Sequence, residues 1–87
     1  MRDVSFSSQA WADYLTWLQN DKVVAQRVNQ LIEAVQRDPF EGIGKPEPLK
    51  HQLAGWWSRR ITDEHRLVYR VAEGRVEITR LRDHYSP

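Results

Sequence analysis

The sequence contains no cysteine and only one methionine among its 87 residues. Without cysteine, a disulfide framework and a thiolate metal site are both excluded. No stretch is long and apolar enough to span a membrane, and the N-terminus lacks the apolar core of a signal peptide. We therefore expect a soluble protein of the cytoplasm.

The chain is long enough for one domain, covering residues 1–87, with a thin hydrophobic core. Four tryptophans supply a large apolar area for that core. Charge is unevenly divided, because residues 1–44 carry four Lys/Arg and six Asp/Glu, whereas residues 45–87 carry nine and six. The basic second half indicates either a surface that faces phosphates or an ordinary solvated sheet face.

The first part of the chain predicts a strand followed by two helices. Apolar and polar residues alternate over residues 3–6, which is typical of a short strand with one buried face. Apolar residues then recur at helical spacing, which predicts one helix that ends at about residue 20 and a second that ends at about residue 37. The second helix must end there because Asp38 precedes Pro39. Side chains that can cap the two helices are Ser7 or Ser8 and Asp21.

Each predicted helix carries an apolar stripe that we expect to pack against a sheet. The stripe of the first helix is Trp11, Tyr14, Leu15 and Leu18. The stripe of the second helix is Val24, Val28, Leu31 and Val35, widened by Ile32. We interpret both stripes as core rather than as a cofactor site.

The second part of the chain predicts three strands, near residues 56–61, 66–71 and 76–82. Gly74 lies in the short connection between the last two strands, as is typical of a hairpin. Leu81 breaks the alternation, which indicates a bulge or the end of regular pairing. We predict an α+β fold, in which two helices pack on one face of an antiparallel β-sheet.

A stiff segment, GKPEPLKH at residues 44–51, separates the helices from the strands. Pro46 and Pro48 flank Glu47 and favour extended backbone at the preceding residues, Lys45 and Glu47. Gly42, two residues before this segment, and Gly44, its first residue, allow the backbone to approach the rest of the protein closely. We predict that the segment positions the Glu47 carboxylate for chemistry on a phosphate-containing substrate.

One face of the predicted sheet is cationic. Arg66, Val68 and Arg70 alternate with apolar residues along one strand, and a buried apolar face disfavours two guanidinium groups. We therefore expect this face to be open to solvent. Both Glu47 and the terminal residues 83–85 could reach it.

Glu47, Arg66 and His84 together form a set suited to phosphodiester cleavage in RNA. A carboxylate can take the proton of a ribose 2′-hydroxyl, and a guanidinium can stabilise the charge that develops on the phosphorus oxygens. An imidazolium can protonate the departing 5′-oxygen. Residues that could stack on a base or hold flanking phosphates are Tyr85, Lys50 and Arg60.

Each of these residues also has an ordinary explanation as a solvated charge on a loop, a strand or a chain end. His51 and His65 lie beside predicted turns, and we interpret both as structural. The three histidines are widely spaced and lack paired ligands, so we expect no metal site. No glycine-rich phosphate loop and no Ser–His–acid order is visible.

Five segments, spread over nearly the whole chain, carry a specific resemblance to a known family. They are PFEG at 39–42, GKPEPLKH at 44–51, WSRRIT at 57–62, EHRLVY at 64–69 and RDHY at 82–85. In this order the segments closely resemble the YoeB-type toxins of the RelE/ParE toxin–antitoxin superfamily. The resemblance implies a RelE-like, microbial-ribonuclease-like fold and a messenger-RNA endoribonuclease that acts in the ribosomal A site.

The resemblance also implies roles for individual residues. It makes Glu47 the general base, Arg66 the group that stabilises the transition state, and His84 the general acid. The remaining substrate contacts that it implies are Tyr85, Lys50 and Arg60. It further implies inhibition by a YefM-like antitoxin, a homodimer, and no cofactor.

Two features depart from the family pattern, because the family commonly ends at His-Tyr. This chain continues with Ser86-Pro87, and Asp83 precedes His84. Two alternatives remain at this stage: a gyrase-inhibiting ParE-like toxin and a non-catalytic RNA- or protein-binding module. The joint presence of Glu47, Arg66 and His84 argues against the first alternative.

Overall fold

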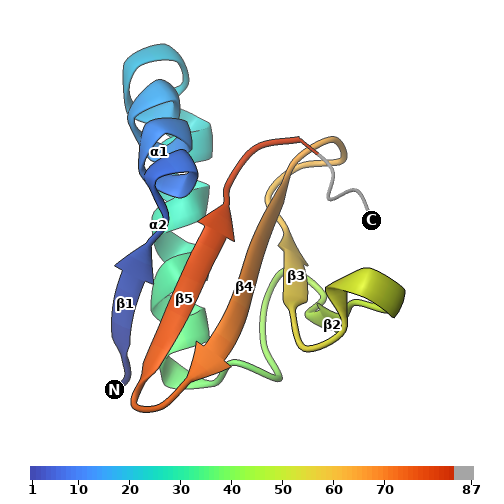
Figure 1. The fold of residues 1–87 in the computed structure, drawn as a ribbon. Coiled ribbons are helices and arrows are strands. Elements are labelled where there is room, and N and C mark those ends of the chain that lie inside the picture. Colours follow the sequence, from blue (N-terminus) through green and yellow to red (C-terminus); the bar gives the residue numbers. More distant parts are fainter. Residues whose placement is uncertain (84–87) are drawn as a thin grey trace.

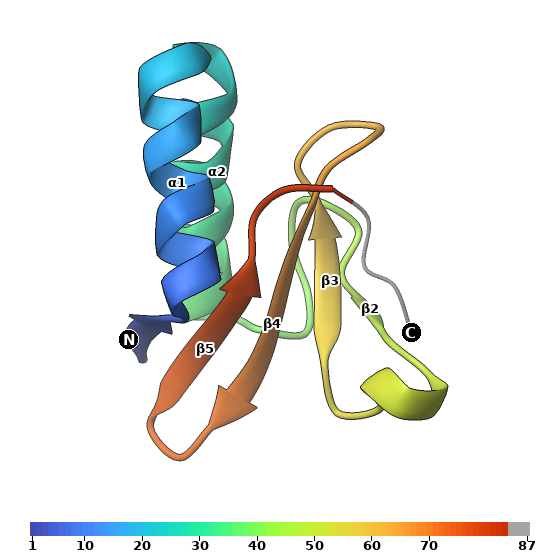
Figure 2. The ribbon, with the colours of Figure 1, turned by 45° about the horizontal axis from the view of Figure 1, so that its top comes forward.

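The computed structural model describes residues 1–83, which form two helices and a small sheet (Figure 1). In chain order the elements are β1 (Asp3–Phe6), α1 (Ser8–Asn20), α2 (Lys22–Arg37), β2 (Glu47–Pro48), the 3₁₀ helix η1 (His51–Leu53), β3 (Trp57–Arg60), β4 (Arg66–Ala72) and β5 (Arg75–Arg80). Figure 2 shows the two helices side by side. Within the described part of the chain, neither helix has both the length and the apolar character that crossing a membrane requires.

The strands lie in the order β1-β5-β4-β3-β2. Strands β3 to β5 pair antiparallel as predicted, and the helices pack on one face, so the α+β class is confirmed. The short strand β2, which was not predicted, adds an antiparallel pair with β3. The sheet as a whole is mixed, because β1 runs parallel to β5, with Asp3 opposite Arg75 and Phe6 opposite Ile78. Local alternation predicts a strand but not the direction of a neighbour that is distant in sequence.

Both helices begin at a predicted capping residue. The Ser7 hydroxyl accepts a hydrogen bond from the Ala10 N–H at 3.0 Å, at the start of α1. The Asp21 carboxylate accepts one from the Val24 N–H at 3.2 Å, at the start of α2. These caps satisfy backbone donors that have no partner within a helix. The predicted end of α2 at Arg37 is also confirmed.

The buried face of α1 differs from the prediction. Much of the predicted stripe is exposed to solvent, at 50% for Trp11, 38% for Leu15 and 41% for Leu18. The residues that α1 buries are Ala10, Asp13 and Trp17. The prediction was wrong because Asp13 and Trp17 both bond to the backbone of Leu81, and these contacts orient the helix around its axis.

The main core lies between the helices and β4 and β5. On the α2 side the predicted stripe is confirmed, since Val28, Leu31 and Val35 are buried. The residues in the strands or just after them that join these helix residues in one cluster are Ile61, Leu67, Tyr69, Val76, Ile78 and Leu81. The core packs against one face of the sheet, and the opposite face of the sheet carries the candidate site.

A fully buried arginine lies on the core side of the sheet. Arg59 of β3 donates through its Nε to the Tyr69 hydroxyl at 3.2 Å, and that hydroxyl donates to the Pro39 carbonyl at 2.6 Å. The carbonyls that accept from the two terminal nitrogens are those of Asp38 (2.5 Å), Glu41 (3.0 Å) and Ile43 (3.1 Å). The guanidinium therefore ties the loop after α2 to β3.

The close approach predicted for the glycine segment is present at Gly44. Its φ is 86°, and an added Cβ would lie 2.7 Å from Leu31 Cδ2. The Gly44 carbonyl accepts a hydrogen bond from the Arg60 N–H at 2.7 Å. Glu47 has the predicted extended backbone, as part of β2. Lys45 has a φ of 52°, so the extended backbone predicted at that residue was wrong. The tertiary contacts of Gly44 override the local preference.

We predict that Gly44→Ala destabilises the protein by about 1–3 kcal/mol, because the new methyl group overlaps Leu31 and the backbone becomes strained. Gly74→Ala is the matched control, since Gly74 has a φ of 72° but no heavy atom within 4 Å of the added Cβ. Gly74→Ala should therefore lower the free energy of unfolding only by the backbone strain of an alanine at positive φ, roughly 1 kcal/mol. Urea unfolding of both variants measures the difference, and equal losses would contradict the close approach.

Tyr69→Phe removes the hydroxyl that joins Arg59 to Pro39, and we expect a loss of about 1–3 kcal/mol in the free energy of unfolding. Burial raises the pKa of Tyr69, although Arg59 opposes the shift. Because the pKa of this tyrosine is higher in the folded state, its contribution to stability is fully present below its pKa in the unfolded state, about 10. That contribution is lost as the pH rises through its pKa in the folded state.

Wild-type protein should therefore lose stability above about pH 10 more steeply than Tyr69→Phe does. Tyr14→Phe is the control, because the Tyr14 hydroxyl makes an exposed hydrogen bond to Asn29. Urea midpoints between neutral and alkaline pH provide the measurement. Parallel curves for wild type and Tyr69→Phe would show that the buried phenol does not control this region.

Candidate active site

Strand register places three of the predicted site residues on one face of the sheet. Glu47 lies opposite Ser58, which lies opposite Val68, and Arg60 lies opposite Arg66. Residues directly opposite in paired strands point to the same face, with Cβ atoms about 5 Å apart. Positions two apart along a strand share that face. Glu47, Arg60 and Arg66 therefore gather on the face that the helices leave uncovered.

The predicted base and the predicted transition-state cation form an ion pair. The guanidinium of Arg66 donates to Glu47 Oε1 at 3.4 Å. The side chain of Glu47 is 51% exposed, whereas that of Arg66 is 17% exposed. Because partly exposed pairs of this kind contribute little to stability, the main effect of the contact is to hold the two charges together.

The uncovered face is less open than predicted. Val68 is 3% exposed and Ser58 is fully buried, and Leu49, just after β2, is 6% exposed. Val68 and Leu49 lie outside the main core cluster. The expectation of a face open to solvent was therefore wrong at these positions, because alternation along β4 predicts which side Val68 points to but not how deeply it is buried there. The candidate site is thus a charged pair next to an apolar floor.

Lys50 and Arg60 both lie between Glu47 and Arg66 in the sequence, and both are exposed. Arg60 lies directly opposite Arg66 in the β3–β4 ladder, so the two side chains leave the sheet from adjacent positions on one face. Lys50 lies two residues beyond the end of β2 and directly precedes η1. The structure therefore joins Arg60 to the Glu47–Arg66 pair, while Lys50 lies at the margin.

Asp83 is the last described residue, and two hydrogen bonds fix it beside Arg66. Its N–H donates to His65 Nδ1 at 2.8 Å, and its carbonyl accepts from the Arg66 N–H at 3.2 Å. The predicted residues His84 and Tyr85 lie outside the described part of the chain. The structure thus brings the terminal segment to Arg66 as far as Asp83.

Sequence reasoning missed a group of residues that holds this terminal segment. The buried Asp13 carboxylate accepts from the Leu81 N–H at 2.9 Å, and the Trp17 indole donates to the Leu81 carbonyl at 2.8 Å. The ring of Trp17 meets that of His65 edge to face, with centroids 4.8 Å apart. The spacing of Ala10, Asp13 and Trp17 at i, i+3 and i+7 is a helical signal that could have revealed this face.

Arg70 belongs to the uncovered face as predicted, but other protein groups engage it. Its Nε donates to Glu77 at 2.6 Å, and its guanidinium lies 4.5 Å from the centre of the Trp56 ring. Arg75 donates to the same carboxylate at 2.8 Å. Hydrogen bonds from Arg70 and then Arg75 lower the pKa of Glu77. We therefore leave Arg70 out of the candidate site.

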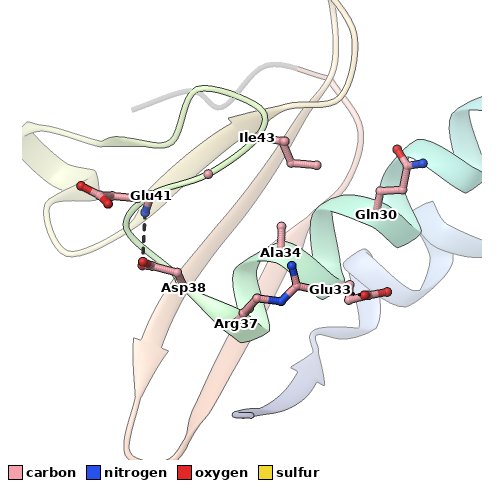
Figure 3. Close-up of a pocket in the computed structure, with 8 residues that line it drawn as sticks. Gln30, Glu33, Ala34, Arg37, Asp38, Glu41 and Ile43 are labelled. Atoms are coloured by element: carbon pink, nitrogen blue, oxygen red, sulfur yellow. Dashed lines mark hydrogen bonds and ion pairs between the residues drawn. The ribbon is translucent and has the colours of Figure 1, made fainter.

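A separate pocket of about 330 Å³ lies between α2 and the loop that follows it (Figure 3). Its lining includes Ala34, Ile43 and the ion-paired Glu33 and Arg37, but none of the predicted site residues. Among residues 1–83, no group of three or more His, Asp or Glu side chains is arranged to hold a metal ion.

Comparisons with known proteins identify one family. The model of the family described as "YoeB-like toxin of bacterial type II toxin-antitoxin system" matches residues 6–85. The chain is 55% identical over 85 residues to Toxin YoeB of Mycobacterium bovis, covering 98% of this chain and all of that protein. It is 54% identical over 80 residues to Toxin YoeB of Escherichia coli K12, covering 92% and 95%.

Solved structures agree in fold over nearly the full length. A YoeB/ParE toxin from Agrobacterium tumefaciens superposes with a TM-score of 0.91 at 45% identity, covering 95% of this chain and 99% of that one. A YoeB dimer from Staphylococcus aureus has a TM-score of 0.89 at 45% identity, covering 97% and 98%. A YoeB–YefM complex from the same organism has a TM-score of 0.88 at 43% identity, covering 98% and 99%.

We predict that Glu77→Gln lowers stability at neutral pH and that the difference from wild type disappears in acid. A lowered pKa gives stability that is present above about pH 4 and is lost as pH falls through the folded value. Glu73→Gln, in the exposed hairpin turn, is the control. Urea midpoints at pH 7 and in acid test this, and a difference that persists at the lowest pH would contradict the ionic origin.

Proposed function

The chain belongs to the YoeB-like toxin family of bacterial type II toxin–antitoxin systems, and from this premise we propose that it is an endoribonuclease. Its substrate is messenger RNA bound in the A site of the ribosome. Cleavage there stops translation. The observation that carries the proposal is the 3.4 Å contact between Glu47 and Arg66, at the point where the terminal segment is bonded to the Arg66 backbone.

The reaction begins at the ribose 2′-hydroxyl of the scissile nucleotide. The Glu47 carboxylate accepts its proton, and the 2′-oxygen attacks the adjacent phosphorus. Half of the Glu47 side chain is exposed, so a substrate hydroxyl can reach it. Arg66, already beside this carboxylate, stabilises the negative charge that builds on the phosphorus oxygens. The mostly covered position of Arg66 reduces competition from water.

The second half of the reaction breaks the bond between phosphorus and the 5′-oxygen. The His84 imidazolium gives its proton to that oxygen, which leaves as a 5′-hydroxyl. The other product is a 2′,3′-cyclic phosphate. His84 follows Asp83 directly, and the Asp83 carbonyl is bonded to the Arg66 N–H, which supports assigning the acid to this region.

Substrate contacts extend from this centre along the uncovered face. Arg60, opposite Arg66 in the ladder, contacts a flanking phosphate, and Lys50 at the margin contacts another. Tyr85 stacks on a base next to the scissile bond. These contacts place the RNA without taking part in proton transfer.

Two protein partners follow from the relatives. A YefM-like antitoxin inhibits the toxin, and a second copy of the chain forms a homodimer, in line with the S. aureus assemblies. An acidic antitoxin segment that folds on binding would find complementary charge at Arg60 and Arg66. Covering this face blocks access of RNA to Glu47.

We predict that a messenger with 2′-deoxyribose at the scissile nucleotide is not cleaved, because the nucleophile is missing, although it still binds through its phosphates.

Glu47→Gln and Arg66→Ala should each slow cleavage on programmed ribosomes by about a hundredfold or more, and His84→Ala likewise. Arg70→Ala is the matched control for Arg66→Ala, since Arg70 lies on the same face but pairs with Glu77.

Mapping of messenger ends after mixing with ribosomes provides the measurement, and circular dichroism checks that each variant folds. Cleavage of the deoxy messenger would refute 2′-hydroxyl attack. Ribosome binding without any cleavage by wild-type protein would instead favour a non-catalytic module. Inhibition of gyrase without cleavage would favour a ParE-like toxin.

A further inference from the structure

The residue after β5 is held by two side chains of α1, one at each of its backbone groups. The Leu81 N–H donates to Asp13 Oδ2, and the Leu81 carbonyl accepts from Trp17 Nε1. The Leu81 side chain is itself fully buried in the core. Both backbone polar groups of this residue and its side chain are therefore fixed at once.

A second pair of bonds holds the chain two residues later. Asp83 donates to His65 Nδ1 and accepts from the Arg66 N–H. His65 in turn lies edge to face against Trp17, so the two fixed points share one support. For this bond His65 must carry its proton on the other ring nitrogen. The contacts form a continuous clamp from α1 to the Arg66 backbone.

The chemistry of the clamp is costly for an ordinary strand end. Asp13 is 4% exposed, and burying a carboxylate is unfavourable unless its hydrogen bonds compensate. Its other oxygen accepts from Gln9 at 2.8 Å. A neutral side chain or water could satisfy one backbone N–H at the surface. The buried carboxylate instead fixes the segment firmly.

We propose that Asp13 and Trp17 are positioning residues for the cleavage reaction. They fix the backbone from Leu81 to Asp83, and so set the point beside Arg66 from which the chain continues to the general acid. The inference rests on the proposed function, because it needs His84 to protonate the leaving oxygen. Asp13 and Trp17 touch no substrate and act only through the segment that they hold.

Replacing the 5′-oxygen of the scissile bond with sulfur separates this role from a general loss of structure. Breaking the phosphorus–sulfur bond releases a thiolate, which needs no proton from the enzyme because thiols are far more acidic than alcohols. A defect in placing the acid is therefore corrected by the sulfur substrate. A defect in the fold, in RNA binding or in the general base lowers the rate on both substrates, and the sulfur substrate does not correct it.

The experiment compares single-turnover cleavage of oxygen and sulfur messengers on programmed ribosomes. Asp13→Ala and Trp17→Phe should lose roughly tenfold to hundredfold in rate on the oxygen substrate, as expected for a misplaced group. Both should recover on the sulfur substrate, as we also expect of His84→Ala, whereas Glu47→Gln should not. Asp13→Asn should lose less than Asp13→Ala, because its amide oxygen can still accept from the Leu81 N–H although the charge is gone.

Trp11→Phe is the matched control for Trp17→Phe, since Trp11 is half exposed on the same helix. If Asp13→Ala does not fold, Trp17→Phe carries the test. An equal loss on both substrates, or no loss in a folded variant, would overturn the clamp proposal while His84→Ala still supports the proposed function. No cleavage by wild type, or an unaffected His84→Ala, would overturn both.

Discussion

The hydrogen bonds of the buried Arg59 guanidinium are the constraint on which the candidate site depends. A charged group inside a small core is tolerated only when its donors are satisfied. Here the acceptors are carbonyls of the loop after α2, together with the Tyr69 hydroxyl. The loop is thereby pulled against β3, which brings Gly44 into contact with Leu31 and starts β2 at Glu47. Packing of one arginine thus determines where the carboxylate lies.

The site is built where three independently supported pieces of chain meet. The loop tied down by Arg59 supplies Glu47, and the β3–β4 ladder supplies Arg66 from the interior of the sheet. The third piece is the segment held by Asp13 and Trp17. Each support lies on the side of the sheet that faces the helices, while the charges lie on the other side. Preorganisation of this kind lets a small domain hold charged groups in place without a deep pocket.

The sequence predicted the elements well because their signals are local. Caps at Ser7 and Asp21, the end of α2 and the glycine hairpin each depend on a few neighbouring residues. Errors arose where distant contacts decide the outcome. Lys45 adopts positive φ against its pre-proline preference, and Trp11 is exposed although its spacing predicts burial. In both cases tertiary contacts outweigh a local preference.

By itself, the sequence determined the α+β class, the order of the two helices and of every strand except β2, and the family, because periodicity, turn residues and motifs are all read along the chain. It also identified Glu47 and Arg66 as chemically matched groups. Only the tertiary structure decided that they lie 3.4 Å apart, that Arg70 is engaged by Glu77, and that Asp13 is buried. Such facts depend on strand register and on the rotation of a helix about its axis, which form only when segments distant in sequence pack together.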